Sequence, residues 1–160
     1  MEIIEYQKKY SEDVKDLLVE LQEYIVSIDT WHLNIMTPQY RKLYFEKTMK
    51  ECGKNQGIMF LAKENEKIVG MICGHLSVYD KYDRADYKCP KSGIIEELIV
   101  SKNSRSSGGG MALIEKIEAY FKNLGCQYCH VDVFEPNAIG RKFYAKNGYT
   151  ERLISLSKRI

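Results

Sequence analysis

A glycine-rich stretch at residues 100–111 carries the chemistry that this sequence indicates most directly. It follows an apolar run and leads into residues at helical spacing, so its glycines stand where a helix should begin. A helix start offers unpaired backbone N–H groups and a positive dipole end, and both favour phosphate. The glycines at 108–110 let a ligand approach the main chain, and Arg105 adds a fixed positive charge. The stretch therefore predicts a phosphate-binding turn, with a flexible surface loop as the alternative. It matches neither the GxxxxGK[ST] nor the GxGxxG fingerprint.

Two acids, Glu96 and Glu97, lie inside the otherwise apolar run at 93–100. Adjacent residues of a strand face opposite sides of a sheet. We therefore expect at most one of the two carboxylates to face a given cleft.

The sequence from Cys126 to His130 matches the CxxCH form used for covalent haem attachment. It leads, however, into the alternating, β-prone run at 127–134, in which Cys126 and Cys129 would point to opposite faces. We favour two buried structural thiols, and a redox or haem protein built on these residues is the alternative.

The elements that must position these residues follow from the periodicity of apolar residues. Helical spacing predicts helices over 11–28, from Thr37 and Pro38 to Gly53, and over 106–124 and 137–147. Strand-like runs occupy 2–6, 58–64, 68–79, 93–100, 127–134 and 149–160. This order predicts an α+β domain with a mixed sheet.

The bulk properties fit one globular domain over residues 1–160. The chain is 44% apolar and 29% charged, and its formal net charge of +2 is too small to indicate nucleic acid or an anionic membrane as the main partner. It has no apolar run of membrane-spanning length. Five cysteines, an odd number, favour reduced thiols over a disulfide framework, so we expect a cytoplasmic protein.

Two ordered motifs resemble those of the GNAT superfamily of N-acetyltransferases. The pyrophosphate loop of that family reads V-x-P-x-x-R-x-x-G-x-G/A, and the C-terminal block reads N-x-x-A/G-x-x-x-Y-x-x-x-G-F/Y. The residues in register are Val100, Arg105, Gly108, Gly110, Asn137, Gly140, Tyr144, Gly148 and Tyr149. Lys102 replaces the usual proline, Ser106 a common glycine and Gly109 a larger residue.

The resemblance implies a mixed, mostly antiparallel sheet with splayed central strands and about four flanking helices. It also implies acetyl-CoA as cosubstrate, bound in the gap between the strands, and no metal. The implied cofactor-binding residues are Leu98, Ile99, Val100, Arg105, Ser106, Ser107, Gly108, Gly109, Gly110, Met111 and Asn137. Asparagine at 137 would equally serve as a helix N-cap.

Direct attack by a primary amine on the thioester requires a base, and the resemblance favours Glu96 over Glu97. Tyr144 matches the tyrosine that protonates the departing thiolate. No cysteine occupies a matched catalytic position, so we expect transfer in a ternary complex without an acyl-enzyme.

The acceptor, a small amine or a protein amino group, is expected to contact the loops at 29–35 and 79–92. Their candidate residues are Asp29, Trp31, His32, Tyr79, Tyr82, Asp83, Asp86 and Tyr87. A non-catalytic acyl-CoA-binding domain of the same fold is the alternative function. Relatives commonly form homodimers, but no residue pattern in this chain indicates one.

Overall fold

The computed structural model describes residues 1–105 and 107–160, and it is built around one five-stranded sheet in the order β1-β2-β3-β4-β5. The strands are β1 (Glu2–Glu5), β2 (Ile58–Glu64), β3 (Lys67–Leu76), β4 (Ser92–Val100) and β5 (Tyr128–Val131). The first four strands pair antiparallel, and β4 pairs parallel with β5. The mixed, mostly antiparallel sheet predicted from the sequence is confirmed.

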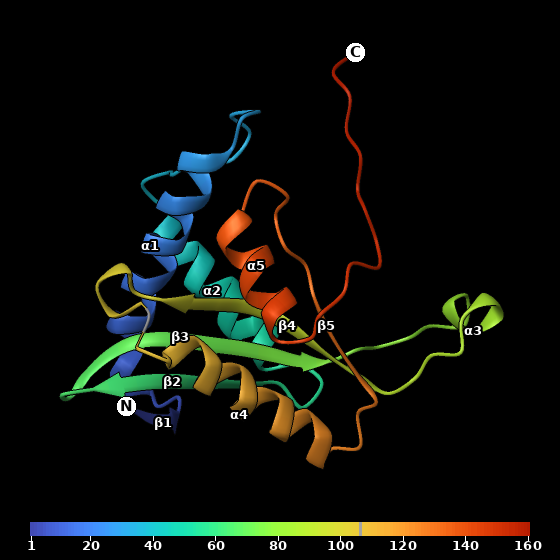
Figure 1. The fold of residues 1–160 in the computed structure, drawn as a ribbon, viewed down its shortest axis with the longest axis horizontal. Helices are drawn as coiled ribbons and strands as arrows, with labels where there is room; N and C mark the ends of the chain where they lie inside the picture. The colour runs from blue at the N-terminus through green and yellow to red at the C-terminus, as the bar shows by residue number, and fades with distance from the viewer. Residues whose placement is uncertain (106) are drawn as a thin grey trace.

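Helices cover both faces of this sheet (Figure 1). They are α1 (Ser11–Ile28), α2 (Tyr40–Cys52), the short α3 (Asp83–Asp86), α4 (Gly109–Asn123) and α5 (Ala138–Lys146), with 3-10 turns at Lys8–Tyr10 and Lys102–Ser104. Helices α1 and α2 pack on one face and α4 packs on the other, while α3 lies on an arm that projects from the body. None of the helices in the described residues combines the length and apolar character needed to cross a bilayer.

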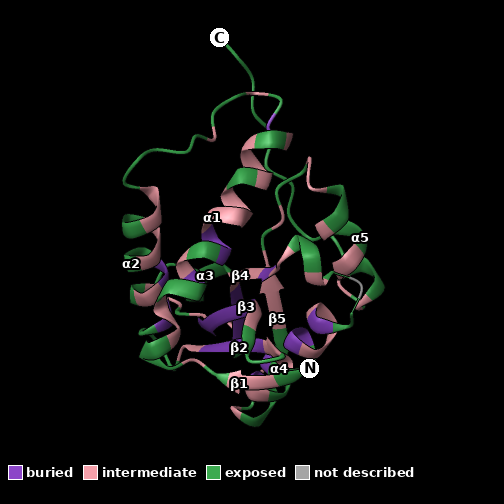
Figure 2. Cartoon of the chain, turned by 90° about the vertical axis from the view of Figure 1, so that its left-hand side faces the viewer, coloured by how far each residue is buried: buried purple, intermediate pink, exposed green. Residues whose placement is uncertain are grey.

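Each face of the sheet has its own apolar core, because side chains alternate along the strands. The core under α1 and α2 contains Val14, Leu17, Leu18, Cys52, Met59, Leu61, Met71, Cys73 and Ile99. The core under α4 contains Phe60, Ala62, Ile72, Leu76, Ile95, Leu113, Ile114, Ile117 and Phe121. Figure 2 shows these buried residues gathered on the strands and on the inner sides of α1 and α4.

Strands β4 and β5 stay together only over four residue pairs, from Ser92↔Tyr128 to Ile95↔Val131. Strand β4 continues for five more residues to Val100, whereas β5 ends at Val131. The two strands therefore diverge, as the splayed sheet of the sequence-based prediction requires.

Several predicted bounds were wrong, among them the strand over 68–79, which ends at Leu76, and the helix over 106–124, which begins at Gly109. No strand forms over 149–160, because this segment leaves the body of the protein and its main chain meets no sheet edge (Figure 1). Strand β5 stops before 132–134, since those residues no longer lie beside β4. The second helix begins at Tyr40, whose N–H donates to Thr37 O in a turn that precedes the helix.

Candidate active site

A cavity of about 750 Å³ opens where β4 and β5 diverge, between α1, α2 and α5. Among the residues that line it are Glu96, Glu97, Leu98, Ile99, Val100, Arg105, Gly108, Gly109, Gly110, Met111, Asn137 and Tyr144. Ser107 is not part of this lining, and its hydroxyl donates to Ser104 O at 2.7 Å. Ser106 lies outside the described residues. Most of the site residues predicted on the strand, the glycine-rich turn and the C-terminal block therefore line one cavity, and their roles stay predictions.

The two acids line the same cavity because β4 contains a β-bulge. Cys73 of β3 pairs with Glu97, but the next residue, Gly74, pairs with Ile95, so that Glu96 is an extra residue on β4. A bulge of this kind interrupts the alternation of side chains. The expectation that at most one carboxylate would face a given cleft was wrong for this reason.

The main chain of β4 presents hydrogen-bonding groups to the gap, and among them the Val100 carbonyl accepts from Arg105 Nε. Ser101 N–H donates to Val69 O at 2.8 Å, which fixes the phase of the ladder with β3. Because ladder hydrogen bonds alternate in an antiparallel pair, the main chain of Ile99 also faces β3. The N–H and C=O groups of Leu98 and Val100 face the opposite edge, where β5 has diverged. The resemblance assigned the main chains of Leu98, Ile99 and Val100 to the ligand. Those of Leu98 and Val100 face the gap, whereas that of Ile99 faces β3.

The glycine-rich turn ends at the start of α4, as predicted. Gly108 is the N-cap and has the left-handed φ of 86°, which disfavours a side chain, although the space beside it is open. Gly109 is buried, and a Cβ there would lie 2.7 Å from the sulfur of Met1. At Gly110 a Cβ would approach the Phe143 ring to 3.2 Å. The methionine side chain thus occupies the position beside Gly109 that the resemblance assigns to a larger residue.

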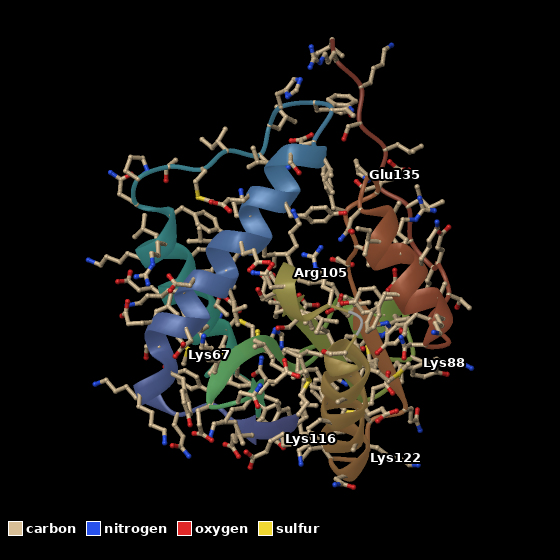
Figure 3. The ribbon with its side chains drawn as sticks, turned by 60° about the vertical axis from the view of Figure 1, so that its left-hand side comes forward. Lys67, Lys88, Arg105, Lys116, Lys122 and Glu135 are labelled. Atoms are coloured by element: carbon tan, nitrogen blue, oxygen red, sulfur yellow. The ribbon has the colours of Figure 1, made fainter. Side chains whose placement is uncertain are left out.

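Arg105 supplies positive charge at this end of the cavity. Its Nε donates to Val100 O at 3.2 Å, and its guanidinium lies 5.8 Å from the centre of the Tyr24 ring. In Figure 3 Arg105 lies where the end of β4 meets α1, whereas Lys116 and Lys122 on α4 lie well away from it. Arginine in this place can bind phosphate oxygens through two parallel hydrogen bonds.

Glu20 of α1 is a contact that the sequence analysis missed. Its carboxylate accepts from the Ser101 hydroxyl at 2.9 Å and from Lys102 N–H at 2.5 Å. It therefore ties the first residues of the glycine-rich turn to α1. Nothing local in the sequence indicates this pair, because its members lie about eighty residues apart in the chain.

Glu97 is held by α2. The Tyr44 hydroxyl donates to Glu97 Oε1 in a short hydrogen bond, and Tyr40 stacks on Tyr44 with ring centres 4.7 Å apart. Burial raises the pKa of Glu97, while the Tyr44 hydrogen bond and Lys47 oppose that shift. Burial also raises the pKa of Tyr44, with the Glu97 charge adding to it.

Glu96 is held by β3. Its Oε1 lies 2.9 Å from Nε2 of His75, and Nδ1 of the same ring lies 2.9 Å from Leu76 O. About a third of the Glu96 side chain remains exposed (31%), compared with 11% for that of His75. Glu96 therefore combines a fixed partner with access from the cavity.

The remaining two predicted residues come from the C-terminal block. Burial raises the pKa of Tyr144, and the Glu97 charge adds to the shift, so Tyr144 keeps its proton at neutral pH. Asn137 lines the cavity but also caps α5, since its Oδ1 accepts from Gly140 N–H at 2.8 Å. The same oxygen lies 3.3 Å from the Tyr24 hydroxyl of α1, which donates to it.

The two loops expected to contact the acceptor do not both reach this cavity. Asn34 lines it, but none of the candidate residues at 29–35 and 79–92 does so in the described structure. Asp29 instead organises its own loop, accepting from the N–H groups of Trp31, Leu33 and Asn34. The second loop carries α3 on an arm that projects from the body (Figure 1), and none of the described residues of this loop lines the cavity.

Cys126 and Cys129 both pack against the core under α4, since Cys126 precedes β5 and is not subject to its alternation. Burial raises the pKa of both thiols, that of Cys129 to about 11, which is unfavourable for thiolate chemistry. His130 stacks on Tyr128. Within the described residues, no group of three or more potential metal ligands is present.

Comparison with known proteins agrees with this geometry. The sequence profile described as "Acetyltransferase (GNAT) family" matches residues 25–149, so the chain belongs to this family. It is 32% identical over 85 residues to glucosamine 6-phosphate N-acetyltransferase 1 of Dictyostelium discoideum, covering 53% of this chain and 50% of that protein. It is 31% identical over 94 residues to an uncharacterized N-acetyltransferase of Methanocaldococcus jannaschii, covering 58% and 53% respectively. The matched region thus spans about half the length of these curated relatives.

Solved structures with the same fold cover essentially the whole chain. A mutant protein from Bacillus halodurans is 20% identical, with a TM-score of 0.79 over 100% of this chain and 99% of that one. An aminoglycoside N-acetyltransferase in complex with CoA is 18% identical, with a TM-score of 0.68 over 99% and 100% of the two chains. At these identities the likeness establishes the fold alone.

Proposed function

We propose that this protein is an N-acetyltransferase that transfers an acetyl group from acetyl-CoA to a primary amine by direct attack in a ternary complex. One observation carries this proposal: main-chain groups of β4 that face away from β3, a glycine-rich helix start and two carboxylates line a single cavity. We also propose that residues 1–160 act as a single domain.

The donor would bind along β4. The main chains of Leu98 and Val100 would pair with the amides of the pantetheine arm, as an added strand does. The N–H groups at the start of α4 and Arg105 would hold the pyrophosphate. The sequence-based assignments at Ser106 and Ser107 remain predictions.

The reaction would need three groups of this chain, with acetyl-CoA supplying the activated acetyl thioester. Glu96 takes a proton from the acceptor ammonium and leaves a neutral amine. Leu98 N–H stabilises the negative charge that develops on the acetyl oxygen as the C–N bond forms. Tyr144 donates a proton to the sulfur as the C–S bond breaks, and it regains one, through water, from the nitrogen that becomes the amide.

The acceptor end of the cavity favours a cationic amine. Glu96 and Glu97 supply negative charge there, and the stacked rings of Tyr40 and Tyr44 supply aromatic faces. Asn34 also lines the cavity and adds a polar side chain to it. The aminoglycoside acceptor of one structural neighbour belongs to this chemical class.

A thiol-release assay with acetyl-CoA and a panel of amines tests the proposal. Saturable acetyl-CoA binding without thiol release on any amine would indicate a non-catalytic acyl-CoA-binding domain.

Glu96→Gln should lower kcat by about 100-fold or more with little change in acetyl-CoA affinity. Equal rates in this variant and the wild type would remove Glu96 from the mechanism, and Glu97→Gln would then test the other acid. Acetyl label that stays on denatured protein would exclude direct transfer.

A further inference from the structure

His75 contacts Glu96 in a geometry that limits where protons can lie. The imidazole is buried on β3, with Nδ1 2.9 Å from Leu76 O and Nε2 2.9 Å from Glu96 Oε1. A carbonyl oxygen can only accept a hydrogen bond, so Nδ1 must carry a hydrogen. A neutral ring would then direct the lone pair of Nε2 at an ionised carboxylate. The contact with Glu96 therefore needs one further proton, either on Nε2 or on the carboxyl group.

The charges around the pair bear on where that proton lies. Glu97 lies next to Glu96 in the bulge and lines the same cavity. Glu51, near the end of α2, is also within electrostatic reach of His75: Lys54 lowers the pKa of Glu51 most, and His75 contributes to the same shift. Lys54, 2.9 Å from Glu51, and Lys50 are the cations facing Glu51, and Lys47 is the cation facing Glu97. Glu96 contacts the ring directly and Glu51 acts on it through space, so a cationic ring beside an ionised Glu96 is favoured over a neutral ring beside a protonated acid.

The bulge gives the two acids different partners on one side of the sheet. His75 pairs with Ile94, and Glu96, two residues further along β4, lies on the same side as Ile94 and therefore as His75, whereas in a regular strand residue 97 would face the opposite side. The extra residue keeps Glu96 beside His75 and leaves Glu97 beside Tyr44. Gly74 permits this path, because a Cβ there would lie 2.1 Å from Ile94 O.

We propose that His75 is a positioning residue, a buried imidazolium that keeps Glu96 ionised and fixes its Oε1, so that Oε2 is the oxygen offered to the acceptor amine. This rests on the proposed role of Glu96 as the base. The number of protons on the His75–Glu96 pair does not depend on that role, because it follows from hydrogen-bond geometry and can be measured without any turnover.

The protonation of His75 can be read by NMR of protein labelled with ¹⁵N at its histidines. We expect both ring nitrogens of His75 to carry hydrogens at pH 7, with the signals assigned by their loss in His75→Gln. In Glu96→Gln the side-chain amide can donate to a bare Nε2, so the ring should become neutral and keep its hydrogen on Nδ1 alone. A neutral His75 in the wild-type protein at pH 7 would overturn the proposal.

Kinetics test the positioning role separately. His75→Leu removes the donor to Glu96 and should lower kcat by about tenfold, with the KM for acetyl-CoA within about twofold of wild type. His75→Gln retains an N–H donor near the Nε2 position and should recover a substantial part of that loss. His130→Gln on β5, outside the cavity lining, is the matched control and should leave kcat unchanged.

The outcomes separate the two proposals. If Glu96→Gln abolishes turnover while His75→Leu has no effect, the positioning role is wrong and the proposed function stands. If Glu96→Gln has no effect, the proposed base is wrong, and the NMR result still decides the protonation of the pair. Thermal unfolding of each variant identifies a loss of rate that comes from misfolding.

Discussion

At the scale of single residues, two neighbouring acids differ because each has a different partner. Glu97 is desolvated and depends on the Tyr44 hydroxyl, while Glu96 is partly exposed and contacts a histidine. A partly desolvated carboxylate that loses its donor is destabilising, since water replaces the hydrogen bond only incompletely. The partner of each side chain, and not its residue type, thus distinguishes a structural acid from a candidate base.

Tyr44→Phe tests this at Glu97. The variant removes the donor to a half-buried carboxylate, so the free energy of unfolding should fall by about 1–3 kcal/mol. The pKa of Glu97 should rise further, because the Tyr44 hydrogen bond lowers it in the wild type. Tyr40→Phe is the control. It deletes the hydroxyl of the stacked ring, and this hydroxyl has no hydrogen-bond partner among the described residues. Equal losses in the two variants, measured by urea unfolding at pH 7, would contradict the prediction.

Asp29 gives the loop at 29–35 a dependence on pH. Backbone hydrogen bonds, that of Asn34 first, lower the pKa of Asp29 from 3.8 to about 2. A lowered pKa means that the stabilisation is complete above pH 4 and is lost as the pH falls towards 2. Trp31, the only tryptophan, donates its backbone N–H to Asp29 Oδ1 and reports on this loop.

We therefore expect Trp31 fluorescence to change between pH 4 and pH 2. Asp29→Asn replaces one acceptor oxygen by an amide group and removes the titration, so the fluorescence of this variant should not follow the same curve. Far-UV circular dichroism separates loop opening from unfolding of the domain. If the Trp31 fluorescence of the wild-type protein does not change between pH 4 and pH 2 while the circular dichroism is also unchanged, Asp29 does not hold this loop.

At the scale of elements, the start of α4 depends on the backbone conformation of Gly108. Valine there is strained by the positive φ and would place a branched side chain where phosphate should approach. Gly108→Val should weaken acetyl-CoA binding by about 100-fold or more, as measured by calorimetry. Gly125, just after α4, has a similar φ of 82° and also has open space beside it, so Gly125→Val is a matched control. If both variants bind acetyl-CoA equally well, the turn does not hold the pyrophosphate.

The sequence predicted those elements whose signal is local. The hairpin between β2 and β3 is an example, because its turn residues Asn65 and Glu66 adopt the positive φ angles that a tight hairpin requires. The bulge at Glu96 could not be predicted, since a bulge is defined by the register of a partner strand. The contact of Glu20 with the glycine-rich turn is hidden for a similar reason: it depends on how α1 crosses the sheet. Periodicity in one segment carries no information about either.

At the scale of the whole molecule, the cavity depends on elements from both ends of the chain. Tyr24 of α1 donates to Asn137, which caps α5, and Glu20 of α1 holds the turn before α4. The α1 helix itself is fixed by its core residues on the sheet, such as Leu18. The candidate site therefore forms only when the complete sheet and its helices are assembled.

The last packed side chain before the C-terminal segment is Tyr149. Its ring packs against the core under α4, and its hydroxyl donates to Glu118 at 2.7 Å. Beyond it, Leu153 and Leu156 are 88% and 89% exposed, so this segment buries little apolar surface. We therefore expect deletion of residues 153–160 to change the free energy of unfolding by less than about 0.5 kcal/mol. Tyr149→Ala should lower it by roughly 2–3 kcal/mol, since it removes a packed ring and a hydrogen bond. Urea unfolding of both variants decides this, and a deletion as costly as Tyr149→Ala would mean that the segment pairs with a sheet edge in solution.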